Sequence, residues 1–363
     1  MTGFDDAGTL AERFRQHARS CSSPLYAALM DAMADDWDVD GPVREVCAGW
    51  EDALPGSVVQ LRLLAGLHRL VLLGEAPELG TFVRTVGGLG APAAAWPMAR
   101  AVIESHVDVL RAGLSLTPQT NEVGRAPALV VGLVDAVSRS GLHEVRLLEV
   151  GASAGLNLLV DYYRIDGDGW SWGPAESALR LDSAVKGSVA AQQVAVVSRR
   201  GCDLSPVDAS TSEGRLLLSS YVWPDHLERF ERLRAALRVA AQHPVVVEVG
   251  SAWEWVERVL AEPAVHGVLT VVWHSISRMY WPAAEVARVD AALAEAGRRM
   301  ALAHVQMEYS HGAELGARLE VRVWRNGEPD GRRTDIGGVA DHGVPVRLHD
   351  HVHVGTRGHS TSR

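Results

Sequence analysis

The hydrophobic pattern of this 363-residue chain changes once, near residue 145, and that change limits the folds available to it. Upstream, apolar residues recur every three or four positions, as in Leu64, Leu67 and Val71, which is the period of a helix. Downstream, short apolar runs alternate with helical stretches, which is typical of a mostly parallel sheet covered by helices. We expect an all-helical N-terminal cap domain over residues 1–140, a Rossmann-like domain over residues 141–330, and a hairpin with a flexible tail over residues 331–363.

Seven apolar runs in the second part are expected to be strands. They are residues 145–150, 194–198, 215–221, 245–249, 268–273, 302–309 and 317–324. In the last run Leu319, Val321 and Val323 alternate with charged residues, so the last two runs are expected to form an antiparallel pair. The fold class is therefore expected to be α/β, with a seven-stranded sheet of the class I methyltransferase type.

Charge and composition limit the partners. Lys and Arg number 35 against 45 Asp and Glu, a net charge of −10 that repels nucleic acid and anionic lipid. No apolar run approaches the roughly 18 residues of a membrane span, and residues 1–6 are acidic where a signal peptide would be basic. Three unclustered cysteines suit a reducing compartment, and the late histidines lack a metal-ligand framework. We expect a cytoplasmic protein with a small-molecule substrate and no metal, and we leave a homodimer open.

The strongest local motif follows the first expected strand. There a hydrophobic strand ends in an acid and continues through small residues toward a helix, so the backbone can approach a ligand closely and offer unpaired N–H groups. We predict a ligand-binding loop formed by Glu149, Gly151, Ala152, Ser153, Gly155 and Asn157.

Two chemistries use a loop of this shape. The pattern Glu149-x-Gly151-x-Ser153-x-Gly155 resembles the cofactor loop of class I S-adenosylmethionine-dependent methyltransferases, with serine at the middle glycine. The same residues match the nucleophile elbow of an α/β-hydrolase, in which Ser153 would be the nucleophile. A hydrolase elbow follows a middle strand, yet the first 140 residues are predicted to be helical, so topology favours S-adenosylmethionine. A tight turn without a ligand is the remaining alternative.

Other polar and aromatic residues are expected near the carboxyl ends of the strands, where ligands bind in open α/β sheets. Asp203 follows the second strand and could accept the ribose hydroxyls. The predicted substrate-binding residues are Asn121, Glu122, Arg125, Tyr221, Trp223 and Trp273. An aromatic rim would also attract a sulfonium, although each tryptophan could instead pack helices onto the sheet.

Three residues are candidates for orienting or deprotonating an acceptor. His274 follows a strand expected to be buried, where its pKa could be tuned for acid–base work. Glu248 interrupts an apolar run, which is costly unless the carboxylate is paired or functional. Asp225 could instead belong to the first turn of a helix. For His274 a hydrogen-bonded core role is the alternative.

Five motifs in order resemble one family across nearly the whole chain. They are residues 119–125, 148–158, 201–208, 222–225 and 274–275. On these motifs the chain is identified as a member of the bacterial family named domain of unknown function 2332 (DUF2332), which is similar to the methyltransferase superfamily at the glycine-rich loop. The resemblance implies the fold and the cofactor and leaves the acceptor unknown.

The expected function is that of an S-adenosylmethionine-dependent enzyme that most simply transfers a methyl group to a small molecule. Three alternatives stay open: a cyclase or lyase that consumes S-adenosylmethionine, a serine hydrolase centred on Ser153, and a non-catalytic binding module for S-adenosylmethionine or a nucleotide.

Overall fold

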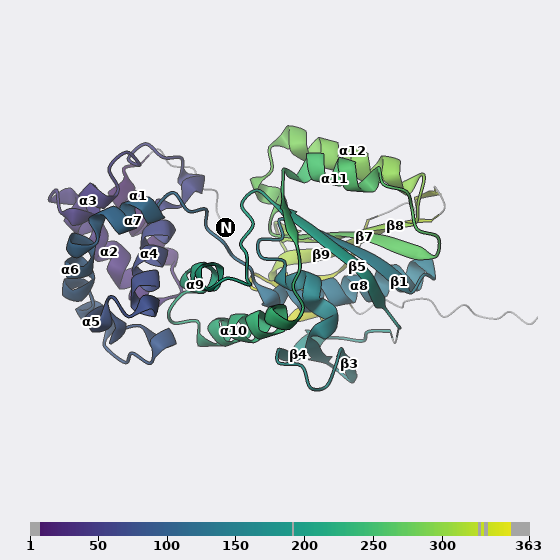
Figure 1. Cartoon of the computed structure of the whole chain (residues 1–363), viewed down its shortest axis with the longest axis horizontal. Helices are drawn as coiled ribbons and strands as arrows, with labels where there is room; N and C mark the ends of the chain where they lie inside the picture. The colour runs from purple at the N-terminus through teal and green to yellow at the C-terminus, as the bar shows by residue number, and fades with distance from the viewer. Residues whose placement is uncertain (1–7, 191, 326–327, 330–332, 350–363) are drawn as a thin grey trace, which may run out of the picture. The chain divides into compact units, whose positions relative to one another are not determined.

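The chain divides into two compact units in a computed structural model that describes residues 8–190, 192–325, 328–329 and 333–349 (Figure 1). Unit 1 is formed by Met1–Thr120 and Thr211–Glu231, and unit 2 by Asn121–Ser210 and Arg232–Arg363. This division differs from the expected one, because the last helix before the first strand belongs to unit 2 and a segment after residue 210 belongs to unit 1. The expected tail, with His351, His353 and His359, lies outside the described residues.

In the described residues, unit 1 is helical. Its elements are α1 (Leu10–Ser20), α2 (Pro24–Asp38), α3 (Pro42–Val46), η1 (Pro55–Ser57), α4 (Val59–Leu73), α5 (Pro77–Gly80), η2 (Arg84–Val86), η3 (Pro92–Ala94), α6 (Trp96–Ser105), α7 (Val107–Gly113) and α9 (Ser212–Ser220). Local chemistry sets their ends: the Ser23 side chain accepts from Tyr26 N at 3.1 Å, and Pro24 follows at the first helical position of α2. Phe14, Met30 and Leu63 are fully buried in the core they share.

The prediction of a strand over residues 215–221 was wrong, because this segment forms helix α9. The Thr211 side chain caps the helix by accepting from Gly214 N at 3.0 Å, and the buried Gly214 and Leu218 are one helical turn apart. The segment is attached to unit 1 by His68 of α4, whose ring nitrogens contact Ser220 O at 3.2 Å and Thr85 Oγ1 at 2.8 Å. Of the three consecutive leucines in this helix, only Leu218 is buried.

Unit 2 contains a mixed sheet. Its strands are β1 (Glu144–Val150), β2 (Arg164–Gly167), β3 (Trp170–Trp172), β4 (Arg180–Lys186), β5 (Ala195–Asp203), β6 (Val247–Val249), β7 (Val268–Ser275), β8 (Leu302–Tyr309), β9 (Gly316–Arg325), β10 (Glu328–Pro329), β11 (Thr334–Ala340) and β12 (Val346–Leu348). The order is β3-β2-β4-β12-β11-β9-β8-β7-β1-β5-β6, with β10 paired to β9. Strands β6, β5, β1, β7 and β8 are all parallel, and their order reverses between β1 and β7.

Helices cover both faces of the parallel part of this sheet. The remaining elements are η4 (Val123–Arg125), α8 (Ala126–Ser140), η5 (Leu156–Tyr162), α10 (Leu227–Gln242), α11 (Ala252–Leu260), η6 (Arg278–Tyr280) and α12 (Ala283–Gly297). Leu148, Val272 and Leu302 of the sheet share one buried cluster with α11 and α12, which lie together on one face (Figure 1). Helix α8 packs on the opposite face, where Gly132 lies against Val305.

The expected number of seven strands was also wrong, since the sheet has twelve in the described residues. The antiparallel pairing of β8 with β9 is present, but β9 continues into further strands instead of ending the sheet. The additional hairpin β2–β3 turns at Asp168 and Gly169, where Gly169 has φ 68°. An Asp-Gly pair is a strong hairpin signal that the strand prediction did not use.

Within the described residues, helices are too short or too polar to cross a lipid bilayer.

Because α8 packs closely on the sheet at Gly132, we expect Gly132→Ala to destabilise the folded protein. An added Cβ would lie 2.3 Å from Val305 Cγ1, and a β-branched side chain has little freedom to move. Overpacking should outweigh the gain in helix propensity and lower the free energy of unfolding by ~1–2 kcal/mol in urea denaturation.

The double variant Gly132→Ala/Val305→Ala is the test of this cause. The Gly132→Ala cost should disappear when Val305 is already alanine, whereas a strictly additive pair would contradict the steric explanation. Gly56→Ala, which meets no atom within 4 Å, is the control and should change stability by less than about 0.5 kcal/mol.

Candidate functional site

The loop after β1 has left-handed backbone at three alternate positions. The φ angles are 71° at Gly151, 53° at Ser153 and 71° at Gly155. Glycine adopts this region without strain, whereas a residue with a Cβ such as Ser153 does so at a cost of roughly 1–2 kcal/mol. The alternation of small residues is therefore a requirement of the backbone.

The two glycines also permit close packing. A Cβ at Gly155 would lie 2.8 Å from Val245 Cγ2 and 2.9 Å from Val247 Cγ2. A Cβ at Gly151 would lie 2.9 Å from Ser277 Cβ, so this glycine lets the segment after β7 approach the loop. The loop continues into a helix, as the motif predicted, and this helix is the 3-10 helix η5.

Two of the predicted site residues hold the loop in place. Asp203, at the end of β5, accepts from Ser153 N through Oδ2 and from Ser205 N through Oδ1, both at 2.9 Å. Asn121 donates from Nδ2 to Ala152 O at 2.8 Å and accepts from Leu156 N at 3.2 Å. The loop is thus fixed by one carboxylate and one amide from distant parts of unit 2.

Glu149 is a buried acid directly before the loop. Glu149 is only 2% exposed. Burial raises the pKa of Glu149 to about 8, although hydrogen bonds from Asn157 and Trp273 and the charge of Arg125 lower it. The carboxyl group is therefore protonated at neutral pH. Among the described residues, its Oε2, together with Asn157 Oδ1 and Trp273 Nε1, is buried without a hydrogen-bond partner of ordinary geometry.

Buried polar atoms without partners are rare in folded proteins and call for a physical explanation. Glu149 and Trp273 are direct neighbours on β1 and β7, and Asn157 lies on η5. Ser277 Oγ, next to Gly151, is a fourth buried atom of this kind. At the carboxyl ends of β1 and β7, a polar ligand group or water could therefore satisfy several buried polar atoms.

Arg125 and Glu122 belong to the same unit and support its loops. Arg125 donates from Nη1 to Ser275 O at 3.0 Å, which ties η4 to the end of β7. Glu122 is buried, accepts from Gly124 N at 2.9 Å, and lies 3.6 Å from Arg232 Nη2. Both side chains have structural contacts in addition to the predicted role in substrate binding.

Glu248 has an evident structural partner set. Arg200 donates to its Oε1 at 2.9 Å and Arg258 to its Oε2 at 2.7 Å. Although burial raises it, hydrogen bonds from Arg258, Trp255 and Arg200 lower the pKa of Glu248 to about 2. A carboxylate held this strongly is a weak proton acceptor at neutral pH, which argues against the predicted acid–base role.

Three other predicted residues belong to unit 1. Asp225 accepts from the Ser23 hydroxyl and from Leu25 N at the start of α2. Tyr221 donates to Leu116 O at 3.2 Å, and the Trp223 ring lies 6.0 Å from that of Tyr26. Each contact joins elements of unit 1, so these residues have packing and capping roles there.

His274 lies at the end of β7, and both of its ring nitrogens are engaged. Nδ1 is 2.6 Å from Glu308 Oε1, and Nε2 is 2.9 Å from His304 Nε2. The sequence predictions missed Glu308 and His304. The available signal was the alternation of polar residues along β8, where positions 304, 306 and 308 share one face.

This arrangement disfavours the serine hydrolase. A triad needs a histidine nitrogen directed at the nucleophile, and His274 directs its nitrogens to Glu308 and His304 instead. In residues 8–143 the structure places no strand, so β1 is the first strand of the sheet, whereas a hydrolase elbow follows a middle strand.

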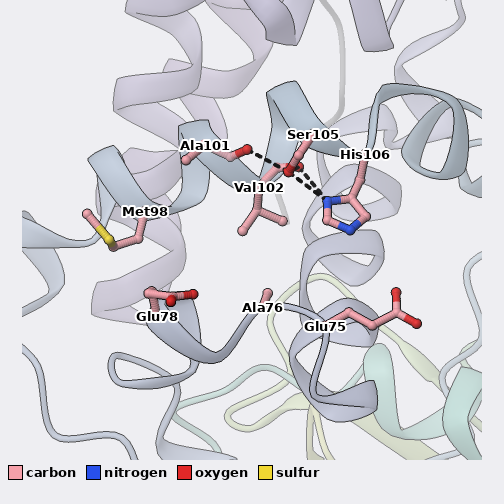
Figure 2. Close-up of a pocket in the computed structure, with 8 residues that line it drawn as sticks. All are labelled: Glu75, Ala76, Glu78, Met98, Ala101, Val102, Ser105 and His106. Atoms are coloured by element: carbon pink, nitrogen blue, oxygen red, sulfur yellow. Dashed lines mark hydrogen bonds between the residues drawn. The ribbon is translucent and has the colours of Figure 1, made fainter.

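Figure 2 shows a pocket of about 200 Å³ in unit 1, between α5 and α6. Its lining residues are Glu75, Ala76, Glu78, Met98, Ala101, Val102, Ser105 and His106. Ser105 Oγ already donates to Ala101 O at 2.8 Å. The pocket contains none of the predicted site residues.

No cluster of three or more metal-binding side chains occurs among the residues described.

The protonated state of Glu149 predicts an unusual pH dependence of stability. Between pH 4.5 and 8 the folded chain keeps this proton while the unfolded chain releases it, so the free energy of unfolding falls as pH rises, by at most about 1.4 kcal/mol per pH unit. Glu149→Gln removes the titrating group. Urea denaturation should show a Gln variant whose stability relative to wild type increases from pH 5 to pH 8.

Glu257→Gln, on the exposed side of α11, is the matched control and should follow the wild-type curve. A difference between wild type and Glu149→Gln that stays constant across this pH range would show that Glu149 is ionised in the folded protein.

Comparison with known proteins adds the family. No curated protein and no solved structure matches the chain. A family model described as "Uncharacterized protein conserved in bacteria (DUF2332)" matches residues 11–347. The match covers most of the chain. It includes the loop after β1, the two residues that hold this loop, Asn121 and Asp203, and the buried Glu149. The chain therefore belongs to the DUF2332 family.

Proposed function

We propose that the chain is an S-adenosylmethionine-dependent enzyme that transfers a methyl group to a small molecule. The observation that carries the proposal is the position of the loop. It leaves the carboxyl end of β1, the strand at which the order of the parallel strands reverses. In open α/β sheets ligands bind at such a reversal, outside the carboxyl ends of the strands. The proposal includes a Rossmann-like fold for this part of unit 2 and a cap role for the helical unit 1.

The donor and acceptor groups fit this cofactor. Glu149 Oε2 and Asn157 Oδ1 are buried and have no hydrogen-bond partner of ordinary geometry among the described residues, so a polar ligand group would remove a cost of ~1–3 kcal/mol for each atom satisfied. Asp203 uses one acceptor position on each oxygen for the loop, and a carboxylate has about four such positions. Two positions remain for ribose hydroxyls.

When bound, S-adenosylmethionine supplies a methyl group on a positively charged sulfur. The residues of this chain would then bind and orient. Asn121 and Asp203 hold the loop rigid, which limits the entropy lost on binding. Glu149, as a neutral acid, offers a hydrogen bond instead of a negative charge. The net charge of −10 favours a small acceptor over nucleic acid.

Two alternatives share this site. A cyclase or lyase would consume the cofactor without an external acceptor, and a binding module would hold it without turnover. Both predict the same affinity for S-adenosylmethionine, so binding is the first property to test.

Calorimetric titration with S-adenosylmethionine and S-adenosylhomocysteine tests the proposal. Wild type should bind with a dissociation constant near the micromolar range, about −8 kcal/mol. Asp203→Asn should weaken binding about 10-fold or more, because it replaces a charged acceptor by a neutral one.

Asp208→Asn is the matched control. Asp208 lies in the same loop region, is exposed, and accepts from its own neighbour Ser210 N at 2.8 Å. Its variant should bind as wild type does. Absence of binding by correctly folded wild type, or equal loss in the two variants, would reject the assignment of the cofactor to this loop.

A further inference from the structure

Two buried histidines and a partly buried glutamate form a continuous hydrogen-bonded chain on β7 and β8. Glu308 Oε1 is 2.6 Å from His274 Nδ1, and His274 Nε2 is 2.9 Å from His304 Nε2. His274 is 0% exposed and His304 2% exposed. The strands are parallel neighbours, and the three side chains lie on the face that carries α12.

Glu308 is held as an anion by its donors. Its Oε1 receives His274 Nδ1 and the backbone N–H groups of Ser277 and Arg278, both at 3.2 Å. Although burial raises it, these hydrogen bonds lower the pKa of Glu308. Because the carboxylate oxygen can only accept, His274 Nδ1 must donate to it.

The charged groups around His274 and His304 determine which of the two rings can carry a positive charge. Burial comes first in lowering the pKa of His304, followed by His274 and by Arg333, Arg278 and Arg322, so His304 is neutral. Arg278 is paired with Asp290 of α12, Arg333 lies 3.6 Å from Glu320 of β9, and Arg322 lies over Trp324. Trp281 covers His274, with ring centroids 5.1 Å apart. A carboxylate therefore faces His274, while cations face His304.

The contact between the two Nε2 atoms requires one proton between them. If His304 donates, both rings are neutral. If His274 donates, it carries two protons, and His304 must hold its own proton on Nδ1. The second state contains one proton more than the first, and both keep every hydrogen bond of the chain.

We propose that Glu308, His274 and His304 form a buried proton-binding site. Uptake of one proton forms an N–H bond at His304 Nδ1. The N–H bond at His304 Nε2 breaks as an N–H bond forms at His274 Nε2, and no electrons are transferred. The positive charge comes to rest on His274 beside the Glu308 carboxylate.

The site has a use at this edge of the sheet. Ser277, whose backbone N–H binds Glu308, lies against Gly151 of the loop. An O–H or N–H acceptor that reacts there releases a proton, and this site would store it. That use rests on the proposed function, whereas proton binding itself does not.

Nuclear magnetic resonance of protein with ¹⁵N-labelled histidine, without any ligand, tests the site. In wild type at neutral pH we expect a ¹⁵N–¹⁵N coupling across the hydrogen bond between His274 and His304. On acidification both rings should respond with one common midpoint, while His274 Nδ1 stays protonated.

Glu308→Gln removes the anion that faces His274, so the common midpoint should move about 1–3 pH units lower. His266→Gln, at an exposed position after α11, is the control and should leave the midpoint unchanged. If Glu308→Gln does not fold, the wild-type coupling and common midpoint remain decisive. Separate midpoints for the two rings, no coupling, or no uptake before unfolding would overturn the proposal. None of these results depends on S-adenosylmethionine, so the two proposals can fail independently.

Discussion

The loop after β1 depends on two side chains that hold its backbone. Ser153 occupies left-handed backbone at a cost of roughly 1–2 kcal/mol, which glycine would avoid. Asp203 accepts the Ser153 N–H directly, and a hydrogen bond to a charged group contributes ~1.5–3 kcal/mol. The bond is thus strong enough to offset the strain, and Asn121 fixes the residues on both sides. The shape of the site is therefore set by β5 and by the segment before α8 as much as by the loop itself.

Glu149 is buried directly before this loop. Its side chain is enclosed with Asn157 of η5 and Trp273 of β7, and an isolated charge there would be very costly. Retention of a proton is the less costly solution. A neutral Glu149 would give a cationic ligand a directional hydrogen bond but almost no long-range electrostatic attraction. The negative charge near the loop is supplied by Asp203 instead.

Local features could be predicted from the sequence, whereas contacts between residues far apart in the chain could not. The end of β1, the small residues after it and the β8–β9 pair follow from period and composition alone. Residues 215–221 were misread because a short apolar run fits a strand or a helix, and only the packing of Leu218 in unit 1 distinguishes them. Arg200 and Arg258 could not be named as partners of Glu248 before the sheet order was known. The same holds for Glu308 and His274, which are 34 residues apart.

Because side chains alternate between the two faces of a strand, adjacent residues of β7 contact two different acidic side chains. On β7, Trp273 and His274 are adjacent in sequence and therefore point to opposite faces of the sheet. Trp273 faces the side of Glu149 and Asn157, where burial keeps a carboxyl group neutral. His274 faces the side of α12, where three N–H donors keep the Glu308 carboxylate charged. Two glutamates at strand ends on either side of β7 thus have opposite protonation at neutral pH because their surroundings differ.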